Sequence, residues 1–578
     1  MQSRQKGAVR SDTDAELTGG FVLSKTSGME ALLGGQNPPI ENEYVDFGKL
    51  SALVIDDISA MRHAVRSQLQ SLGINSIKLA STATEGLTQM EANSFDLIMC
   101  DYNLNNASSG QHFLEYLRSE NILSATSIFV MLTAETEYDF VANAVEFIPD
   151  DYLLKPCSEK KMRSRLTRLL DRRTFLMPVL KAVNLKQYDV AVKECNKLLS
   201  NAPDDRRVMD VLRRKAEAQL ALQDYTEVLE TYDQAAAIRK DVPWIMMGQA
   251  RTHYALGELE AAAKIAKELI EKNKNYVSAY ELLAKICLDT DDEEGSYDYL
   301  CRSSKILPSA KRFRSVSQAA FLLDKLEEAK LNSEEAIRLS TGSMVERTGD
   351  YLSLAQAQVD MGDQKGAVDT LEKTARKHGE VGLFGVAKNA ILAQAYFDLG
   401  DKERSKKLLE RSASLLGNRK NSFVMTALGK SALKVGDVVL GLKLMTQAVQ
   451  ISGKDEKRIA RHVKKSMVDT GHVDKVEDVI DGGRKRILSL VDEATKLMRA
   501  AHFEEAHQKV LEALAIQAEN LEALLTAAQL HLLWLKHSGL DEAIVERAKR
   551  YLTTLDKLVP NNQKVMNFYR FFNEIVSE

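Results

Sequence analysis

Four short apolar runs in the first third of the chain each end in polar residues. They are Leu50–Asp57, Phe95–Asp101, Ser127–Ala134 and Asp151–Pro156. Short apolar runs that alternate with helical patterns predict the parallel strands of an α/β domain. Because ligand sites form at the carboxyl ends of such strands, we expect the polar residues that follow the runs to converge on one edge of the sheet. These residues are Asp56, Asp57, Asp101, Thr133 and Lys155.

From about Thr174 onward the apolar pattern is helical throughout, and small residues recur in it at a regular phase. Their spacing runs from 30 to 38 residues, and the positions are Ala191, Ala262, Ser296, Ala329, Ala367, Ser405, Gly441 and Ala506, with Val228 and Val476 in poorer copies. Small residues allow two antiparallel helices to approach closely. The pattern predicts an all-α solenoid of about ten or eleven helix pairs over residues 173–578. The rival interpretation is an irregular helical bundle, which does not explain why small residues recur at the same position of each helix pair.

The first 47 residues differ from both of these regions. They hold paired glycines, a Pro38–Pro39 pair and many polar residues, which predicts a disordered tail. The tail lacks the apolar core of a secretory signal. Its short apolar island, Met29–Leu33, is interpreted as an idle patch, with a short docking helix as the alternative.

The four apolar runs resemble, in order and context, the receiver domain of bacterial response regulators over residues 48–172. The resemblance implies a flavodoxin-like α/β fold in which Asp101 accepts a phosphoryl group and Asp56 and Asp57 help to bind Mg²⁺. It implies that the backbone carbonyl of Asn103 completes the metal ligands. The other implied site residues are Thr133 and small Ala134 beside the phosphoryl group, Lys155 as its cationic partner, and Tyr152 as the switch aromatic. The Lys155–Pro156 peptide is expected to be cis, because only X–Pro bonds adopt that form at low cost.

The chemistry of these side chains agrees with the resemblance. Crowded carboxylates need a cation to offset their repulsion, and Mg²⁺ prefers oxygen ligands. Phosphoryl transfer depends on positioning and charge neutralisation, which a metal, a lysine and a hydroxyl supply. The loop from Asp101 to Gly110 departs from the commonest family pattern. It lacks a proline, is one residue longer before its glycine and carries Ser109 where an aspartate is frequent, which leaves the phosphorylation lifetime open.

The repeating helical segments resemble the tetratricopeptide repeat (TPR). Good copies lie around Tyr280–Pro308, Tyr351–Leu371, Leu392–Leu409 and Met425–Ala448. The resemblance implies an unidentified protein partner held on the solenoid. No Gly- or Ser-rich linker separates the last receiver helix from the first repeat, and only Pro178 interrupts the helical pattern. We therefore expect a near-continuous helix with a kink or restart at Pro178, through which the two parts are coupled.

The composition of the chain excludes several classes of function. The chain has 78 basic and 82 acidic residues and a formal net charge of −4, which argues against nucleic-acid binding. No apolar run is long enough to span a membrane. The five cysteines show no paired motif, the usage of reduced cytoplasmic thiols. The basic residues between Lys160 and Arg173 are interpreted as the solvated face of the last receiver helix.

These observations predict a cytoplasmic two-component response regulator that is not an enzyme in the ordinary sense. A histidine kinase or phosphotransfer protein would phosphorylate Asp101, and the TPR solenoid would change its binding of a protein partner. The alternative is a phosphorylation-independent scaffold whose receiver serves for dimerisation or docking, so that a homodimer through the receiver stays open. A transcription factor is disfavoured because no DNA-binding motif is present.

Overall fold

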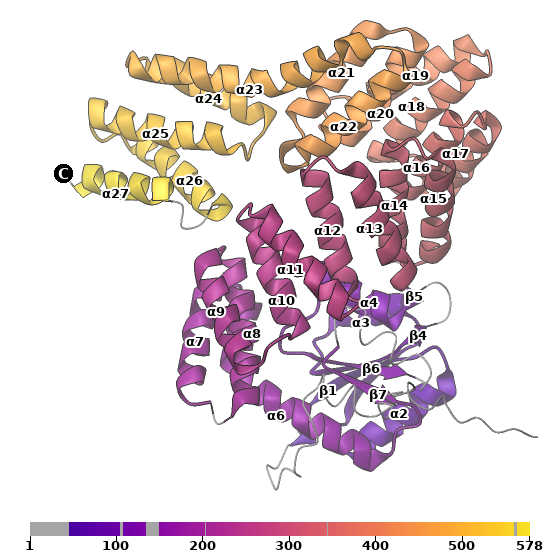
Figure 1. The fold of residues 1–578 in the computed structure, drawn as a ribbon, viewed down its shortest axis with the longest axis vertical. Helices are drawn as coiled ribbons and strands as arrows, with labels where there is room; N and C mark the ends of the chain where they lie inside the picture. Colours follow the sequence, from indigo (N-terminus) through magenta and orange to yellow (C-terminus); the bar gives the residue numbers. More distant parts are fainter. Residues whose placement is uncertain are drawn as a thin grey trace, which may run out of the picture. The chain divides into compact units, whose positions relative to one another are not determined.

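The computed structural model describes residues 46–104, 108–133, 149–202, 204–343, 345–559 and 563–577 (Figure 1). Most of the predicted tail lies outside these ranges. Phe47, which the sequence boundary assigns to the tail, is buried and begins the short helix η1 (Phe47–Lys49).

A five-stranded parallel sheet forms the core of the N-terminal part. Its strands, in spatial order, are β2 (Ser76–Ala80), β1 (Ser51–Ile55), β3 (Leu97–Asp101), β6 (Ile128–Thr133) and β7 (Asp151–Leu154). All neighbouring strands are parallel, so their carboxyl ends share one edge. Every residue of β3 and β6 is buried, as in sheets that are covered on both faces. This is the strand order of flavodoxin-like folds, and the predicted α/β class is confirmed.

The sheet is flanked by helices and carries one small hairpin. The helices are α2 (Ser59–Ser71), α3 (Ala83–Ala92), α4 (Gly110–Ser119) and the beginning of α6 (Glu159–Asn184). The hairpin joins β4 (Asn103–Leu104) to β5 (Ser108–Ser109) in the loop after β3. This is the loop whose length departs from the commonest family pattern.

Helix α6 is continuous across the predicted domain boundary at residues 172 and 173. Its first half buries Met162 and Leu166, and its last turns bury Val179 and Leu180 among the first repeat helices. Pro178 lies inside the helix, so of the expected kink or restart at this position the restart is wrong. The buried side chains that follow Pro178 hold the helical path, which outweighs the one backbone hydrogen bond that proline removes.

The arginines of α6 are not simply a solvated face. Arg165 and Arg168 both pair with the buried carboxylate of Asp151 on β7, each at 3.2 Å. Arg172 and Arg173 likewise pair with carboxylates outside α6. The sequence interpretation is therefore wrong for these four residues. Charge patterning along one helix cannot show that a buried acidic partner lies on another element.

The rest of the described chain is helical, and each helix packs against the next one (Figure 1). The elements are α7 (Tyr188–Ser200), α8 (Asp205–Ala221), α9 (Tyr225–Ile238), α10 (Pro243–Ala255), α11 (Leu259–Lys272), α12 (Val277–Asp289), α13 (Glu293–Ile306), α14 (Ala310–Leu322), α15 (Leu326–Ser340), α16 (Thr348–Asp360), α17 (Gln364–His378), α18 (Gly382–Asp398), α19 (Lys402–Leu416), α20 (Ser422–Val435), α21 (Val438–Gln450), η2 (Gly453–Asp455), α22 (Glu456–Asp469), η3 (Val473–Lys475), α23 (Val476–Arg499), α24 (Phe503–Ile516), α25 (Leu521–Ser538), α26 (Glu542–Leu558) and α27 (Gln563–Ser577). Within the described ranges, no helix has both the length and the apolar character needed to cross a membrane.

The small residues that the sequence placed at helix crossings are buried. Ala191, Ala262, Ser296, Ala367, Ser405 and Ala506 are each 0% exposed. Gly441 is also buried, and a Cβ atom added to it would lie 2.6 Å from the side chain of Leu433 on α20. The predicted all-α solenoid is confirmed, and the steric reason for its small residues holds at these contacts.

Candidate functional site

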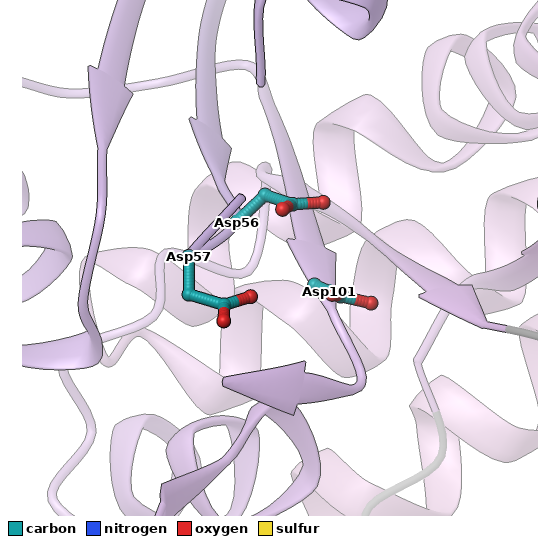
Figure 2. A group of neighbouring side chains, drawn as sticks. All are labelled: Asp56, Asp57 and Asp101. Carbon is teal, nitrogen blue, oxygen red and sulfur yellow. The ribbon is translucent and has the colours of Figure 1, made fainter. Parts of the chain in front are cut away.

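Three carboxylates gather at the carboxyl edge of the sheet. Asp56 and Asp57 directly follow β1, and Asp101 ends the neighbouring strand β3. One oxygen from each carboxylate lies within 4.8 Å of one oxygen of each of the others. Figure 2 shows how the three side chains extend from these two strand ends. The sequence prediction that these residues converge is borne out by their positions.

Lys155 connects two of the carboxylates. Its Nζ atom lies 2.6 Å from Oδ2 of Asp56 and 2.8 Å from Oδ1 of Asp101. Asp56 is completely buried and Asp101 is 7% exposed, so this ammonium group offsets negative charge that little water can reach. The backbone N–H of Lys155 donates to the carbonyl of Thr133 at 2.8 Å, which fixes the lysine at the end of β7.

Burial and mutual charge govern the ionisation of this group. Burial raises the pKa of Asp101, and the neighbouring carboxylates Asp56 and Asp57 add to that effect while Lys155 opposes it. Burial works against the charged form of Lys155, but its hydrogen bonds to Asp101 and Asp56 outweigh burial and raise its pKa. The site therefore favours added positive charge, which is the condition for binding a cation.

The donor set suits a hard divalent cation. Mg²⁺ binds carboxylate and carbonyl oxygens and usually keeps several waters, so it does not need a closed cage of protein ligands. Asp57 is half-buried and Asn103 is exposed, so solvent reaches this side of the group. The residues present fit a magnesium ion bound by two or three carboxylates.

The other predicted site residues are placed as follows. Thr133 is 2% exposed and ends β6, one position beyond the residue that pairs with Asp101 across the sheet. Tyr152 lies on the adjacent strand β7 and is 4% exposed. Ala134 lies outside the described residues. The Lys155–Pro156 peptide is cis, as expected.

Two residues near the carboxylates were missed from the sequence. Arg62 on α2 donates from Nη1 to the backbone carbonyls of Asp56 and Asp57, which holds the strand end in place. Gly110 opens α4, and a Cβ atom at this position would lie 2.1 Å from the carbonyl oxygen of Asp101. Nothing in the sequence around Arg62 indicates that its side chain binds these two carbonyls. The sequence does show a glycine in the loop, but not that a side chain at this position would collide with Asp101.

The loop after Asp101 contacts the repeat helices. Tyr102 packs in an apolar cluster with Val277 at the start of α12 and Leu307 at the end of α13. The Nε2 atom of His112 on α4 lies 3.2 Å from the carbonyl oxygen of Pro308, which is in the turn before α14. The residue next to Asp101 is therefore part of the contact between the sheet domain and the repeats.

An acidic residue of α4 extends this contact. Glu115 lies 3.8 Å from Lys311 and 3.9 Å from Arg312, both at the start of α14. Arg312 is 6% exposed and its Nε donates to Glu281 of α12 at 2.7 Å. Glu115 of α4 thus joins an ion network of the repeats that is centred on the buried Arg312.

Comparison with known families agrees with both halves of this description. Residues 52–167 match the response regulator receiver domain, and residues 219–286 and 389–415 match tetratricopeptide repeat families. The chemotaxis protein CheY-3 of Vibrio cholerae is 25% identical over 123 residues, which cover 21% of this chain and 93% of that protein. The chemotaxis protein CheY of Pseudomonas aeruginosa is 24% identical over 123 residues, covering 21% and 98%.

Solved structures resemble separate parts of the chain. A response regulator receiver domain protein from Clostridium thermocellum is 26% identical and covers 22% of this chain and 98% of its own, with a TM-score of 0.20. The C-terminal part of a TPR repeat-containing protein from Cytophaga hutchinsonii is 15% identical and covers 43% and 98%, with a TM-score of 0.31.

Proposed function

We propose that this chain, which carries a receiver domain followed by tetratricopeptide repeats, is a two-component response regulator whose repeats bind a protein partner. A histidine kinase or phosphotransfer protein would phosphorylate Asp101, and the phosphorylation would change the affinity of the repeats for that partner. The observation that carries the proposal is the buried group in which Lys155 bridges Asp56 and Asp101. The protein would act in the cytoplasm, and its domains would be bounded as the sequence predicts, near residues 48 and 173.

Each residue of the site has a proposed role in phosphoryl transfer. Asp101 would attack phosphorus through one carboxylate oxygen, forming an O–P bond as the N–P bond of a phosphohistidine donor breaks. Mg²⁺, held by Asp56, Asp57, Asp101 and the carbonyl of Asn103, would neutralise charge on the phosphoryl oxygens. Lys155 would pair with one such oxygen and the Thr133 hydroxyl would donate to another, while Ala134 leaves space and Tyr152 responds as the switch residue.

The contact at Tyr102 supports coupling between the site and the repeats. Phosphorylation adds about −1.5 to −2 charge to a side chain that immediately precedes Tyr102 in sequence. A rearrangement of Asp101 would therefore move Tyr102, the next residue, and through it the contact with α12 and α13. This route would act in addition to the one along α6. Beyond accepting and losing a phosphoryl group, no catalytic role is proposed.

The alternative is a scaffold whose receiver serves only for docking or dimerisation. The ionic contacts of Glu115 with Lys311 and Arg312 favour it, because they attach the receiver to α14 through side chains outside the carboxylate group. Under this alternative, partner binding would not depend on phosphorylation.

The test is phosphorylation by acetyl phosphate with Mg²⁺, followed by mass spectrometry and affinity capture of partners by the repeats. We expect the wild type to gain one phosphoryl group and Asp101→Asn to gain none. Asp57→Ala is expected to weaken Mg²⁺ binding, because it removes a charge from the cation site. Phosphorylation of the Asp101→Asn variant would contradict the assignment. Identical partner capture by phosphorylated and unphosphorylated protein would favour the scaffold.

A further inference from the structure

Helix α22 carries a row of basic residues on one face. Lys457, Arg461 and Lys465 are four residues apart, so they lie on the same side of the helix. This face meets the ends of α12 and α14, which precede α22 by more than a hundred residues (Figure 1). The run of helices from α12 to α22 therefore curves back until its two ends touch.

The turn after α12, the first residue of α13 and the turn after α14 supply negative charge to this row. Arg461 lies 2.6 Å from Asp291 and 3.1 Å from Glu293, and Lys465 pairs with Asp324. Lys457 donates to the backbone carbonyl of Asp289 at 3.0 Å, at the C-terminal end of α12. Carbonyls at a helix C-terminus attract cations, so this bond adds to the carboxylate pairs. We call these contacts of α22 with the end of α12, the start of α13 and the end of α14 the closing contact.

Aromatic rings lie behind the closing contact. The ring of His462 on α22 is stacked on Phe321 of α14, with centroids 6.3 Å apart, and meets the edge of Phe423 of α20 at 5.8 Å. Lys430 of α20 bridges Asp360 and Asp469, at 2.8 Å from each. These side chains lie between α14, α20 and α22, and we call this region the inner side of the curved run, where we expect a partner of the repeats to bind.

The two faces of α22 are held by different forces. Its apolar residues Ile459, Val463 and Met467 are 0% exposed and belong to the hydrophobic core of α18–α23. On the basic face, the acceptors Asp291 and Asp324 have side chains that are 79% and 69% exposed, whereas the side chains of Arg461 and Lys465 are 14% exposed. Water and salt reach these ion pairs through their exposed carboxylates and weaken them, whereas apolar burial is not screened by salt. The closing contact can therefore open while α22 stays packed on its neighbouring repeats.

We propose that the closing contact is a conformational switch: the solenoid exists in a closed form, held by the basic face of α22, and in an open form that exposes its inner side to a partner. The proposal rests on the proposed function only in that the repeats bind a protein. Opening needs no unfolding of a helix, because a small bend at each repeat interface from α14 to α21 adds up along the run.

The test uses the full chain without phosphorylation. Arg461→Glu combined with Lys465→Glu places like charges opposite each other at the closing contact. We expect a larger radius of gyration by small-angle X-ray scattering. We also expect amide exchange in residues 288–294 to be about tenfold faster, the change expected from losing two ordinary ion pairs. Raising the salt concentration should move the wild type in the same direction.

The matched control is Lys443→Glu combined with Lys464→Glu, which changes the net charge equally at exposed positions of α21 and α22. It should leave both measurements unchanged. If the first variant fails to fold, Asp291→Lys with Asp324→Lys disrupts the same contact from the other side. Combining both pairs of substitutions should restore the closed form.

An unchanged radius and unchanged exchange in both contact variants would overturn the switch, as would a combined variant that is as open as either pair. The proposed function fails in a different measurement, because phosphorylation of Asp101 does not depend on the closing contact.

Discussion

At the scale of single residues, Lys155 holds together two carboxylates that belong to different strands. Because Asp56 is completely buried, removing the ammonium leaves uncompensated negative charge in the protein. We expect Lys155→Met to lower the free energy of unfolding of the receiver by about 3 kcal/mol in the absence of metal. Mg²⁺ should recover much of this loss, since it supplies the missing positive charge. Thermal unfolding with and without Mg²⁺ measures both effects.

Lys160→Met is the control for this prediction, because Lys160 is an exposed lysine at the start of the same helix, α6. It should change neither stability nor the response to Mg²⁺. Equal stabilisation of the wild type and Lys155→Met by Mg²⁺ would contradict the idea that the ion replaces the charge of Lys155. No stabilisation of either protein would contradict a cation site at the three carboxylates.

His531 predicts a pH dependence of stability. It is 0% exposed, its Nδ1 lies 2.7 Å from the carbonyl of Ala527, and its ring meets His507 edge-on. Burial lowers the pKa of His531 to about 4, with small further contributions from His507, Arg547 and Arg550. The unfolded chain binds a proton near pH 6.5 and the folded chain does not. Stability should therefore be complete above pH 6.5 and fall by about 1.4 kcal/mol per pH unit toward pH 4.

The measurement is the thermal midpoint between pH 7 and pH 4.5. His531→Gln should reduce the slope, although burial also lowers the pKa of His462 to about 4, so part of the slope remains. His502→Gln, at an exposed histidine, should keep the wild-type slope. A slope that is the same in all three proteins would show that His531 is not kept neutral by the fold.

At the scale of elements, close helix crossings depend on glycine. A Cβ atom added to Gly248 of α10 would lie 2.2 Å from the ring of Tyr232 on α9, and that ring is itself buried. Gly248→Ala should therefore destabilise the protein by about 1–3 kcal/mol, the usual cost of overpacking. Chemical denaturation measures the change.

Gly349 provides the matched control within α16, because a Cβ atom there would contact nothing within 4 Å. Gly349→Ala should be neutral, or stabilising by up to about 1 kcal/mol through helix propensity. Equal destabilisation by the two substitutions would mean that backbone conformation, not ring contact, explains glycine at position 248.

At the scale of the whole molecule, two routes connect the carboxylate group with the repeats. One is the continuous helix α6, and the other is the contact of Tyr102 with Val277 and Leu307. Allosteric couplings are typically about 1–3 kcal/mol, so phosphorylation should change partner affinity by about five- to a hundredfold. Inserting a Gly-Ser linker between Arg173 and Thr174 should leave phosphorylation intact and abolish this change if α6 carries it.

Tyr102→Ala separates the second route from the first. If the loop carries the coupling, Tyr102→Ala should abolish the affinity change while the linker variant keeps it. Titration of the captured partner against phosphorylated and unphosphorylated forms of each variant decides between them. A full affinity change in both variants would exclude both routes as the sole conduit.

The sequence by itself determined where the strands of the sheet and the repeat helices lie, and which side chains gather at the carboxyl edge of the sheet. Apolar runs of strand length bury both faces of a parallel sheet, so Asp56, Asp101 and Thr133 had to emerge at the same edge. The recurring small residues, such as Ala262 and Ser405, were expected at helix crossings, because small side chains allow two antiparallel helices to approach closely. These predictions depend on the spacing and the size of side chains along the chain, so they can be made before the fold is known.

Only the tertiary structure decided which elements face each other across long separations. The pairing of Arg165 and Arg168 with Asp151, and the closing contact of α22 with the ends of α12 and α14, join residues whose partners lie on other elements. The direction of a helix in space accumulates from many small packing angles. The sequence of one segment therefore does not show which distant charged residue it contacts. For this reason the sequence of α6 alone predicted solvated arginines, whereas in the fold they pair with carboxylates on other elements.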